Sequence, residues 1–369
     1  MEYEIIRRPF MLLETMEMLF KYVNGISFRS LLSQRQTPSS SPTGDETVRK
    51  LELLQEIMEE VCRDIDPGDP KLRKYFELVK TDLVNSSICL ARFLLCSFSD
   101  FRDPDFQASV DGVRAEWRSL NERGAWIRGY DAVGLNYTCE PGCPGDLFTQ
   151  VYELRLPAEF RLKIYDALRR FDETIGELAN LMYPTAIRLE AALQRAQPVL
   201  DGAADYWLKA PVQPLEFLAE TVGPEAVQGA GERLRLTISL MCCDTIIHGM
   251  AHTSVGSRDY SFMHIGCCIK TDSLVLDRDR TFENISTTLK ALGDKKRLEI
   301  LQRLSKERSY GLELAEVMGM DPGNLSRSLT ALYNYGFLRQ ERENLRTYYQ
   351  TDREALQNFL DRLMAVIFK

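Results

Sequence analysis

Seven side chains that could bind a metal or act as nucleophiles fall within residues 242–268. All three histidines, His248, His252 and His264, lie there, flanked by the cysteine pairs 242–243 and 267–268. Thiols and imidazoles are the ligands that zinc and copper prefer. However, adjacent cysteines on a strand point to opposite faces, and the spacing fits no established metal site. We therefore expect structural residues and no metal here, with a metal or thiol sensor as the alternative.

A second set of polar residues near the C-terminus could contact nucleic acid. Asn324, Ser326, Arg327, Ser328 and Thr330 are interleaved with leucines at helical spacing. A helix over 322–335 would bury the leucines and present these short polar and basic side chains, which can reach base edges and phosphates in the major groove. Its first turn also offers backbone amides to a phosphate.

Three further residues follow in an extended segment. Arg342, Asn344 and Arg346 lie within 337–350, which predicts two strands joined by a short turn. Side chains at the tip of such a hairpin suit phosphates or a minor groove.

The elements that must position the polar residues near the C-terminus can be predicted from the spacing of apolar residues and from the residue types that end helices. A first helix over 295–305 is expected to bury Leu298, Ile300, Leu301 and Leu304, and a second over 309–318 carries Leu312, Leu314, Ala315 and Met318. Gly319 ends the second helix. Asp321 caps the helix over 322–335, which is the expected recognition helix, and Gly336 ends it. With the hairpin and a last helix over 352–368, this is a winged helix-turn-helix.

The same residues resemble a known family. The run Ala291-Leu292-Gly293-Asp294-Lys295-Lys296-Arg297-Leu298-Glu299-Ile300-Leu301 is similar to the opening of ArsR/SmtB-type winged-helix regulators. Leu314-Ala315, residues 325–329, Leu332, 336–338 and 346–349 fall at that family's spacing, so the resemblance covers about residues 285–368.

The resemblance implies a homodimer on a palindromic DNA operator, with the first and last helices of the domain at the dimer interface and an effector controlling transcription. The recognition role would fall on Asn324, Ser326, Arg327 and Ser328, and the wing role on Arg342 and Arg346. The family's metal sites do not carry over, because Tyr310-Gly311-Leu312 replaces the Cys-x-Cys site and the last helix has no histidine.

The preceding region, residues 1–280, has no such resemblance. Apolar spacing predicts helices over 10–23, 46–63 and 158–195, the last bent or broken at Pro184. A small sheet is expected near 233–276, with antiparallel strands over 237–250 and 260–269. The expected fold is therefore mainly α with small β elements (α+β): a helical regulatory or dimerisation region, 1–280, before a DNA-binding domain, 281–369.

Charge divides along the same boundary. The net charge of −8 of the whole chain argues against binding to nucleic acid. The last 89 residues, however, hold 14 Lys and Arg against 12 Asp and Glu, a net of +2, which leaves −10 on the first 280.

The remaining features favour a reducing, intracellular setting. Nine scattered cysteines, the lack of a signal-peptide pattern and the lack of a long apolar run predict a cytoplasmic protein that does not span a membrane. No catalytic motif stands out: Gly249 occupies the position of the glutamate that a zinc-hydrolase motif requires beside His248.

The sequence thus predicts a DNA-binding transcriptional regulator that is not an enzyme and needs no cofactor, with an unidentified effector. Three alternatives stay open: a winged helix used as a protein-interaction module in a scaffold, an enzyme in residues 1–280, and the sensor already named. Four aromatic residues could line a ligand pocket, although packing is the commoner fate: Trp117, Trp126, Tyr130 and Tyr137.

Overall fold

The computed structural model consists of two compact units, which are described separately. One contains Met1–Lys80 and Ser87–Ser273, and the other contains Leu274–Lys369. The structure describes residues 2–30, 42–79, 88–98, 103–122, 147–154, 156–221, 233–251, 260–271, 285–286, 288–343 and 346–367. In these residues no helix is both long and apolar enough to cross a bilayer.

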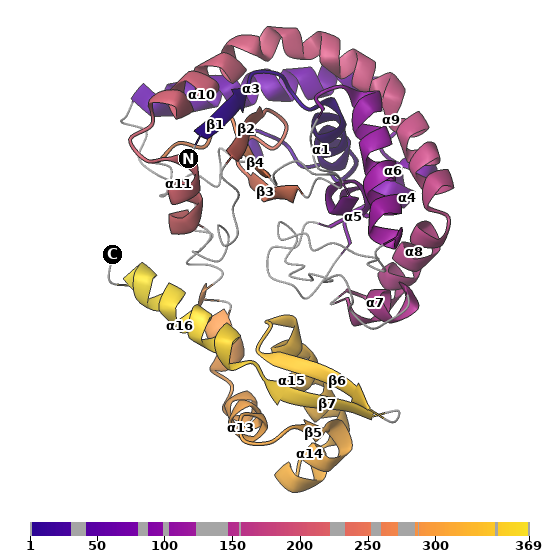
Figure 1. Cartoon of the computed structure of the whole chain (residues 1–369), viewed down its shortest axis with the longest axis vertical. Helices are drawn as coiled ribbons and strands as arrows, with labels where there is room; N and C mark the ends of the chain where they lie inside the picture. Colours follow the sequence, from indigo (N-terminus) through magenta and orange to yellow (C-terminus); the bar gives the residue numbers. More distant parts are fainter. Residues whose placement is uncertain are drawn as a thin grey trace. The chain divides into compact units, whose positions relative to one another are not determined.

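The N-terminal unit is mostly helical, with one small sheet (Figure 1). Helix α1 packs against α4, α5, α6 and α9, and α9 also contacts α3 and α8. Its helices are α1 Met11–Val23, α3 Pro42–Val61, α4 Pro70–Phe76, α5 Leu90–Phe98, α6 Phe106–Glu122, α7 Leu147–Glu153, α8 Ala158–Arg169, α9 Phe171–Leu193, α10 Gln197–Lys209 and α11 Pro214–Thr221. The sheet is made of β1 Glu2–Ile6, β2 Arg233–Ser239, β3 Ile246–Ala251 and β4 Tyr260–Gly266.

The strand order of this sheet is β1-β2-β4-β3. The antiparallel pair that the sequence predicts is present as β3 and β4, with His248 opposite Met263. The expected first strand, however, divides into β2 and β3, and β2 runs parallel to both β1 and β4. The turn between β2 and β3 passes over Gly266, where an added Cβ would lie 2.3 Å from the backbone of Cys243.

The long helical segment after Pro157 is interrupted at a different residue from the one expected. The break falls at Arg170, between α8 and α9, and α9 continues through Pro184. Pro184 is exposed, so water can satisfy the carbonyl that its missing N–H leaves unbonded.

Buried charges join α1 to its neighbours. The Glu14 carboxylate accepts hydrogen bonds from the backbone N–H groups of Leu240 (3.0 Å) and Met241 (2.6 Å), just after β2. Glu17 accepts from Arg92 of α5, with 2.8 Å between Arg92 Nε and Glu17 Oε1. Burial raises the pKa of Glu14 to about 7. Burial would also raise that of Glu17, but Arg92 and Lys21 hold its pKa below the ordinary value.

The C-terminal unit has the predicted winged helix-turn-helix elements in order. They are α13 Lys295–Leu304, β5 Ser309–Tyr310, α14 Gly311–Met318, α15 Pro322–Asn334, β6 Leu338–Glu343, β7 Arg346–Thr351 and α16 Arg353–Ile367. The strands form a sheet of order β5-β7-β6 (Figure 1). The buried core of the C-terminal unit includes Ile300, Leu304, Leu314, Leu325 and Leu329.

One leucine that the sequence assigns to this core is exposed, and so is a second leucine on the next helix. Leu298 is 50% exposed and Leu312 is 70% exposed. At 100° per residue, each lies about 110° around its helix from the centre of the buried stripe. The apolar type of Leu298 suggested burial, but the helical geometry turns both side chains to solvent.

Candidate nucleic-acid interface

A three-residue turn fixes the angle between α14 and α15. Gly319 ends α14 with φ +60°, a left-handed conformation that costs a residue with a Cβ more than it costs glycine. Met320 then donates its backbone N–H to the Ala315 carbonyl at 2.9 Å. Asp321 caps α15 by accepting the Asn324 N–H at 3.0 Å, and Pro322 occupies the first turn. These local interactions start α15 at a defined residue.

Helix α15 presents the predicted recognition residues to solvent. Leu325, Leu329 and Leu332 are buried, which anchors one face of the helix. Ser326, Arg327 and Thr330 lie on the opposite face, where all three are exposed, and Asn324 is exposed at the helix start. Arg327 lies near the middle of that face, so it is placed to reach deepest into a groove.

The side chains on this face already interact with one another. Arg327 Nη2 donates to Asn324 Oδ1 at 2.6 Å, which directs the guanidinium along the helix toward its N-terminal end. Ser328 is half-buried, and its hydroxyl donates to the Asn324 carbonyl at 3.1 Å. Arg327 and the amide NH₂ of Asn324 thus keep donors for a ligand, whereas the Ser328 hydroxyl has a local acceptor.

The start of α15 is less suited to a phosphate than the sequence suggested. The Asn324 N–H goes to the Asp321 side chain, and the Leu325 N–H goes to the Asp321 carbonyl at 2.9 Å. Pro322 has no N–H, and the Asp321 carboxylate adds a negative charge at this end. A phosphate would therefore have to compete with the cap.

The hairpin of β6 and β7 holds Arg346 against an aromatic ring. The Arg346 guanidinium lies over the Tyr310 ring, 4.6 Å from its centre, and Arg308 lies 5.1 Å from the centre of the Tyr348 ring. The two rings meet edge to face at 5.6 Å. Cation–π contacts of this kind restrict a long arginine side chain while leaving its N–H donors available.

The other two predicted wing residues are less fully defined. Arg342 pairs with Thr347 in the ladder, while Arg346 pairs with Glu343. Asn344 lies outside the described residues.

Sequence reasoning did not identify Arg308, Tyr310 and Tyr348. A signal is present in retrospect, because Arg308-Ser309-Tyr310 and Arg346-Thr347-Tyr348 repeat one pattern on two strands. Antiparallel pairing of β5 with β7 sets Tyr310 opposite Tyr348, so each arginine reaches the tyrosine of the other strand. The contacts between these arginines and tyrosines can be inferred from the pattern only when the strand pairing is known.

The four cysteines of the cluster and His264 are buried in the other unit, and His248 is half-buried. Cys242, Cys243, Cys267 and Cys268 are buried, and the sulfurs of Cys267 and Cys268 lie 4.0 Å apart. In the part of the chain that the structure describes, no group of three or more His, Cys, Asp and Glu is arranged to hold a metal ion. His252 lies outside that part.

Cys243, Cys267 and His264 are held in their neutral forms. Hydrogen bonding with Cys268, together with burial, raises the pKa values of Cys243 and Cys267 well above the ordinary thiol value. Burial lowers the pKa of His264 to about 3, and its ring packs edge to face on Phe10 at 5.1 Å. Protonated buried thiols are poor nucleophiles and poor ligands.

Comparison with known proteins is informative for the C-terminal unit. Neither the curated proteins nor the solved structures include a match to the chain. Residues 294–340, from the cap of α13 into β6, match the family model of bacterial regulatory proteins of the arsR family. This part of the chain is therefore an arsR-family helix-turn-helix domain.

Proposed function

We propose that this protein is a transcriptional regulator that binds an operator as a homodimer, with α15 in the major groove and the β6–β7 hairpin on the flanking backbone. The observation that carries the proposal is the exposed face of α15, where Arg327, Ser326, Thr330 and Asn324 lie together on a helix whose start is set by Gly319 and Asp321. The arsR-family match supports the same role. The N-terminal unit would control the dimer in response to an effector, and no catalytic step is assigned to it.

The dimer is supported by an apolar face on the last helix. Leu360, Met364 and Ile367 on α16 are 48%, 54% and 58% exposed, and their spacing places them on one face. Exposed apolar side chains grouped in this way are typical of an interface. A second copy of the chain, related by a two-fold axis, would cover them and set two α15 helices one helical turn of DNA apart.

The direct test is an electrophoretic mobility assay of the full chain on the DNA upstream of its own gene. Arg327→Ala should weaken specific binding about 5- to 150-fold, which corresponds to about 1–3 kcal/mol for an arginine that reads a guanine. Arg195→Ala, which removes an exposed arginine from the N-terminal unit, is the matched control and should leave binding unchanged. Equal affinity for all DNA sequences, or none for any, would contradict the proposal.

A scaffold role remains the rival for the same domain. Leu298, Leu312 and Val317 (56% exposed) give α13 and α14 apolar surface that DNA contacts do not require. If the purified chain shifts no promoter DNA in the mobility assay but is a dimer by sedimentation equilibrium, the protein-interaction hypothesis is favoured. Met364→Lys should produce a monomer under either reading, so only the DNA assay separates the two.

A further inference from the structure

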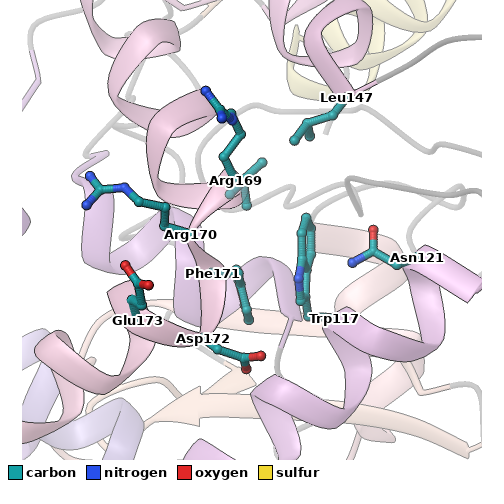
Figure 2. A pocket seen from close by; sticks show the side chains of 9 residues that line it. Trp117, Asn121, Leu147, Arg169, Arg170, Phe171, Asp172 and Glu173 are labelled. Carbon is teal, nitrogen blue, oxygen red and sulfur yellow. The ribbon is translucent and has the colours of Figure 1, made fainter.

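A cavity of about 400 Å³ opens in the N-terminal unit where α8 meets α9. Its lining comes from the C-terminal part of α6, the first residue of α7, and the residues around the break between α8 and α9 (Figure 2). The volume is within the range of small-molecule sites, near its lower end, so it would hold a ligand of one or two rings. The exposed face of α15 and the hairpin are not part of it.

One wall of the cavity is aromatic and firmly packed. Trp117 and Phe171 stack with their ring centres 4.5 Å apart and their planes at 19°. Phe98 meets both rings edge to face, at 5.1 Å from each. Leu147 and Leu168 add apolar surface. A planar apolar body is the shape that such a wall accepts, because aromatic rings pack well edge to face or offset against other rings.

One polar group in the cavity has no partner among the described residues. Asn121 Oδ1 is buried and accepts no hydrogen bond. Figure 2 shows the Asn121 amide beside the Trp117 ring, on the side away from Phe171. A buried acceptor without a donor is costly, and a ligand that brings an N–H or O–H to it would remove that cost.

Among the described residues that line the cavity, one arginine has no carboxylate partner. Asp172 is neutralised by Arg118 (3.5 Å) and Arg114 (3.9 Å). Arg170 forms an ion pair with Asp166 and is also close to Glu173. Arg169, in contrast, has no carboxylate within ion-pair distance among the described residues, and its guanidinium lies 5.9 Å from the centre of the Tyr165 ring. A planar guanidinium of this kind pairs well with a carboxylate.

From these three features we infer that the cavity binds a small planar aromatic carboxylate that also carries an amino or hydroxyl donor. The ring would contact Trp117, the donor would bond Asn121 Oδ1, and the carboxylate would pair with Arg169. This inference rests on the proposed function in one respect, since the ligand would be the effector that acts on the DNA-binding domain. Its binding can nevertheless be measured without DNA.

The test is calorimetric titration of the full chain with 2-aminobenzoate, which has the ring, the carboxylate and the donor. Benzoate lacks the donor and aniline lacks the carboxylate. We expect 2-aminobenzoate to bind saturably, benzoate about fivefold more weakly, and aniline about tenfold more weakly or not at all. Absence of saturable 2-aminobenzoate binding, or equal binding of the three probes, would overturn the inference.

Two variants assign the contacts. Asn121→Leu removes the acceptor at nearly constant size and should abolish the preference for 2-aminobenzoate over benzoate. Arg169→Gln should abolish the preference for 2-aminobenzoate over aniline, whereas Arg170→Gln, whose arginine is already paired, should change affinity less than about threefold. Wild-type preferences that persist in both Asn121→Leu and Arg169→Gln would place the ligand elsewhere.

The same assays separate this inference from the proposed function. If 2-aminobenzoate binds but does not change operator affinity, the site stands and the regulatory link fails. If no probe binds while Arg327→Ala still weakens specific DNA binding, the cavity assignment fails and the DNA-binding proposal stands.

Discussion

In the N-terminal unit, α1 carries Glu14, Glu17 and Lys21 into the interior, whereas every charged side chain that the structure describes in the C-terminal unit is at least partly exposed. The C-terminal unit is stabilised by a core of leucines and by local caps. The N-terminal unit adds to its apolar core a buried ion pair and a carboxylate bound to two backbone amides. Disturbing one partner of a buried pair leaves an uncompensated charge, so the two units should respond very differently to single substitutions.

The largest effect is expected from Glu17→Gln. The substitution removes the carboxylate charge that faces Arg92 and Lys21 in the interior, so the N-terminal unit should lose about 3–5 kcal/mol of unfolding free energy. Urea denaturation followed by tryptophan fluorescence measures this unit alone, because all three tryptophans precede residue 274.

The matched control for this variant is Glu60→Gln. Its partner is Arg195, and the two side chains are 51% and 48% exposed. An exposed pair of this kind is worth less than about 1 kcal/mol. Similar losses of unfolding free energy in both variants would show that burial of the ion pair does not make its disruption more costly.

The next largest effect is a dependence of folding stability on pH, which comes from Glu14. Its pKa in the folded unit is about 7, above the ordinary value of 4.5, so the folded state binds more protons between these values. Stability from this group is therefore present at low pH and is lost as pH rises from about 4.5 to 7, by roughly 3 kcal/mol.

The variant Glu14→Gln isolates this group. Buried His264, whose pKa is about 3, titrates in the opposite sense and adds stability as pH rises toward 6.5. The stability of the wild type minus that of Glu14→Gln, measured by fluorescence-detected denaturation from pH 4.5 to 7.5, should thus fall steadily with pH. A difference that does not vary with pH would contradict the buried-carboxylate argument.

In the C-terminal unit, Gly319→Ala should cost about 1–2 kcal/mol. The left-handed φ of +60° is unfavourable for alanine. Gly311→Ala at the start of the same helix is the control, because its Cβ would meet Leu329 at an ordinary 4.0 Å. Circular dichroism melts should shift for the first variant only, with tryptophan fluorescence unchanged in both. A shift of the fluorescence transition would mean that the two units do not unfold separately.

The smallest effect is expected at the hairpin. Tyr310→Leu removes the ring under Arg346, a contact worth about 0.5–1 kcal/mol, and should weaken operator binding about two- to fivefold. Arg346→Ala should lower the salt dependence of binding by about one counterion without changing sequence preference. If Tyr310 acts by positioning Arg346, then adding Tyr310→Leu to Arg346→Ala should cause no further loss. An additive loss would give Tyr310 a contact of its own.

The order of elements in the C-terminal unit could be predicted from the sequence because their signals are local. Gly319, Asp321-Pro322 and Gly336 mark ends through backbone conformation and capping, and the leucines of α15 repeat at helical spacing. These effects act over a few residues, so no knowledge of distant contacts is needed. Even here, the amino-acid type wrongly assigned Leu298 to the core, because the angle around the helix decides exposure.

The N-terminal unit depends on contacts between residues far apart in sequence. Nothing local to Glu14 indicates that its carboxylate binds amides at residues 240 and 241, and nothing near residues 2–6 indicates that they pair with β2. The cavity at Trp117 likewise requires α6, α8 and α9 to meet.

The sequence alone thus determined the helix-turn-helix and its exposed polar face, because caps, glycines and apolar spacing are local properties of the chain. Only the tertiary structure decided the cross-strand pairing of arginines with tyrosines, the buried charges of α1 and the cavity at the break between α8 and α9. Each of these depends on which distant segments pack together, and a single sequence carries that information only through the folded chain.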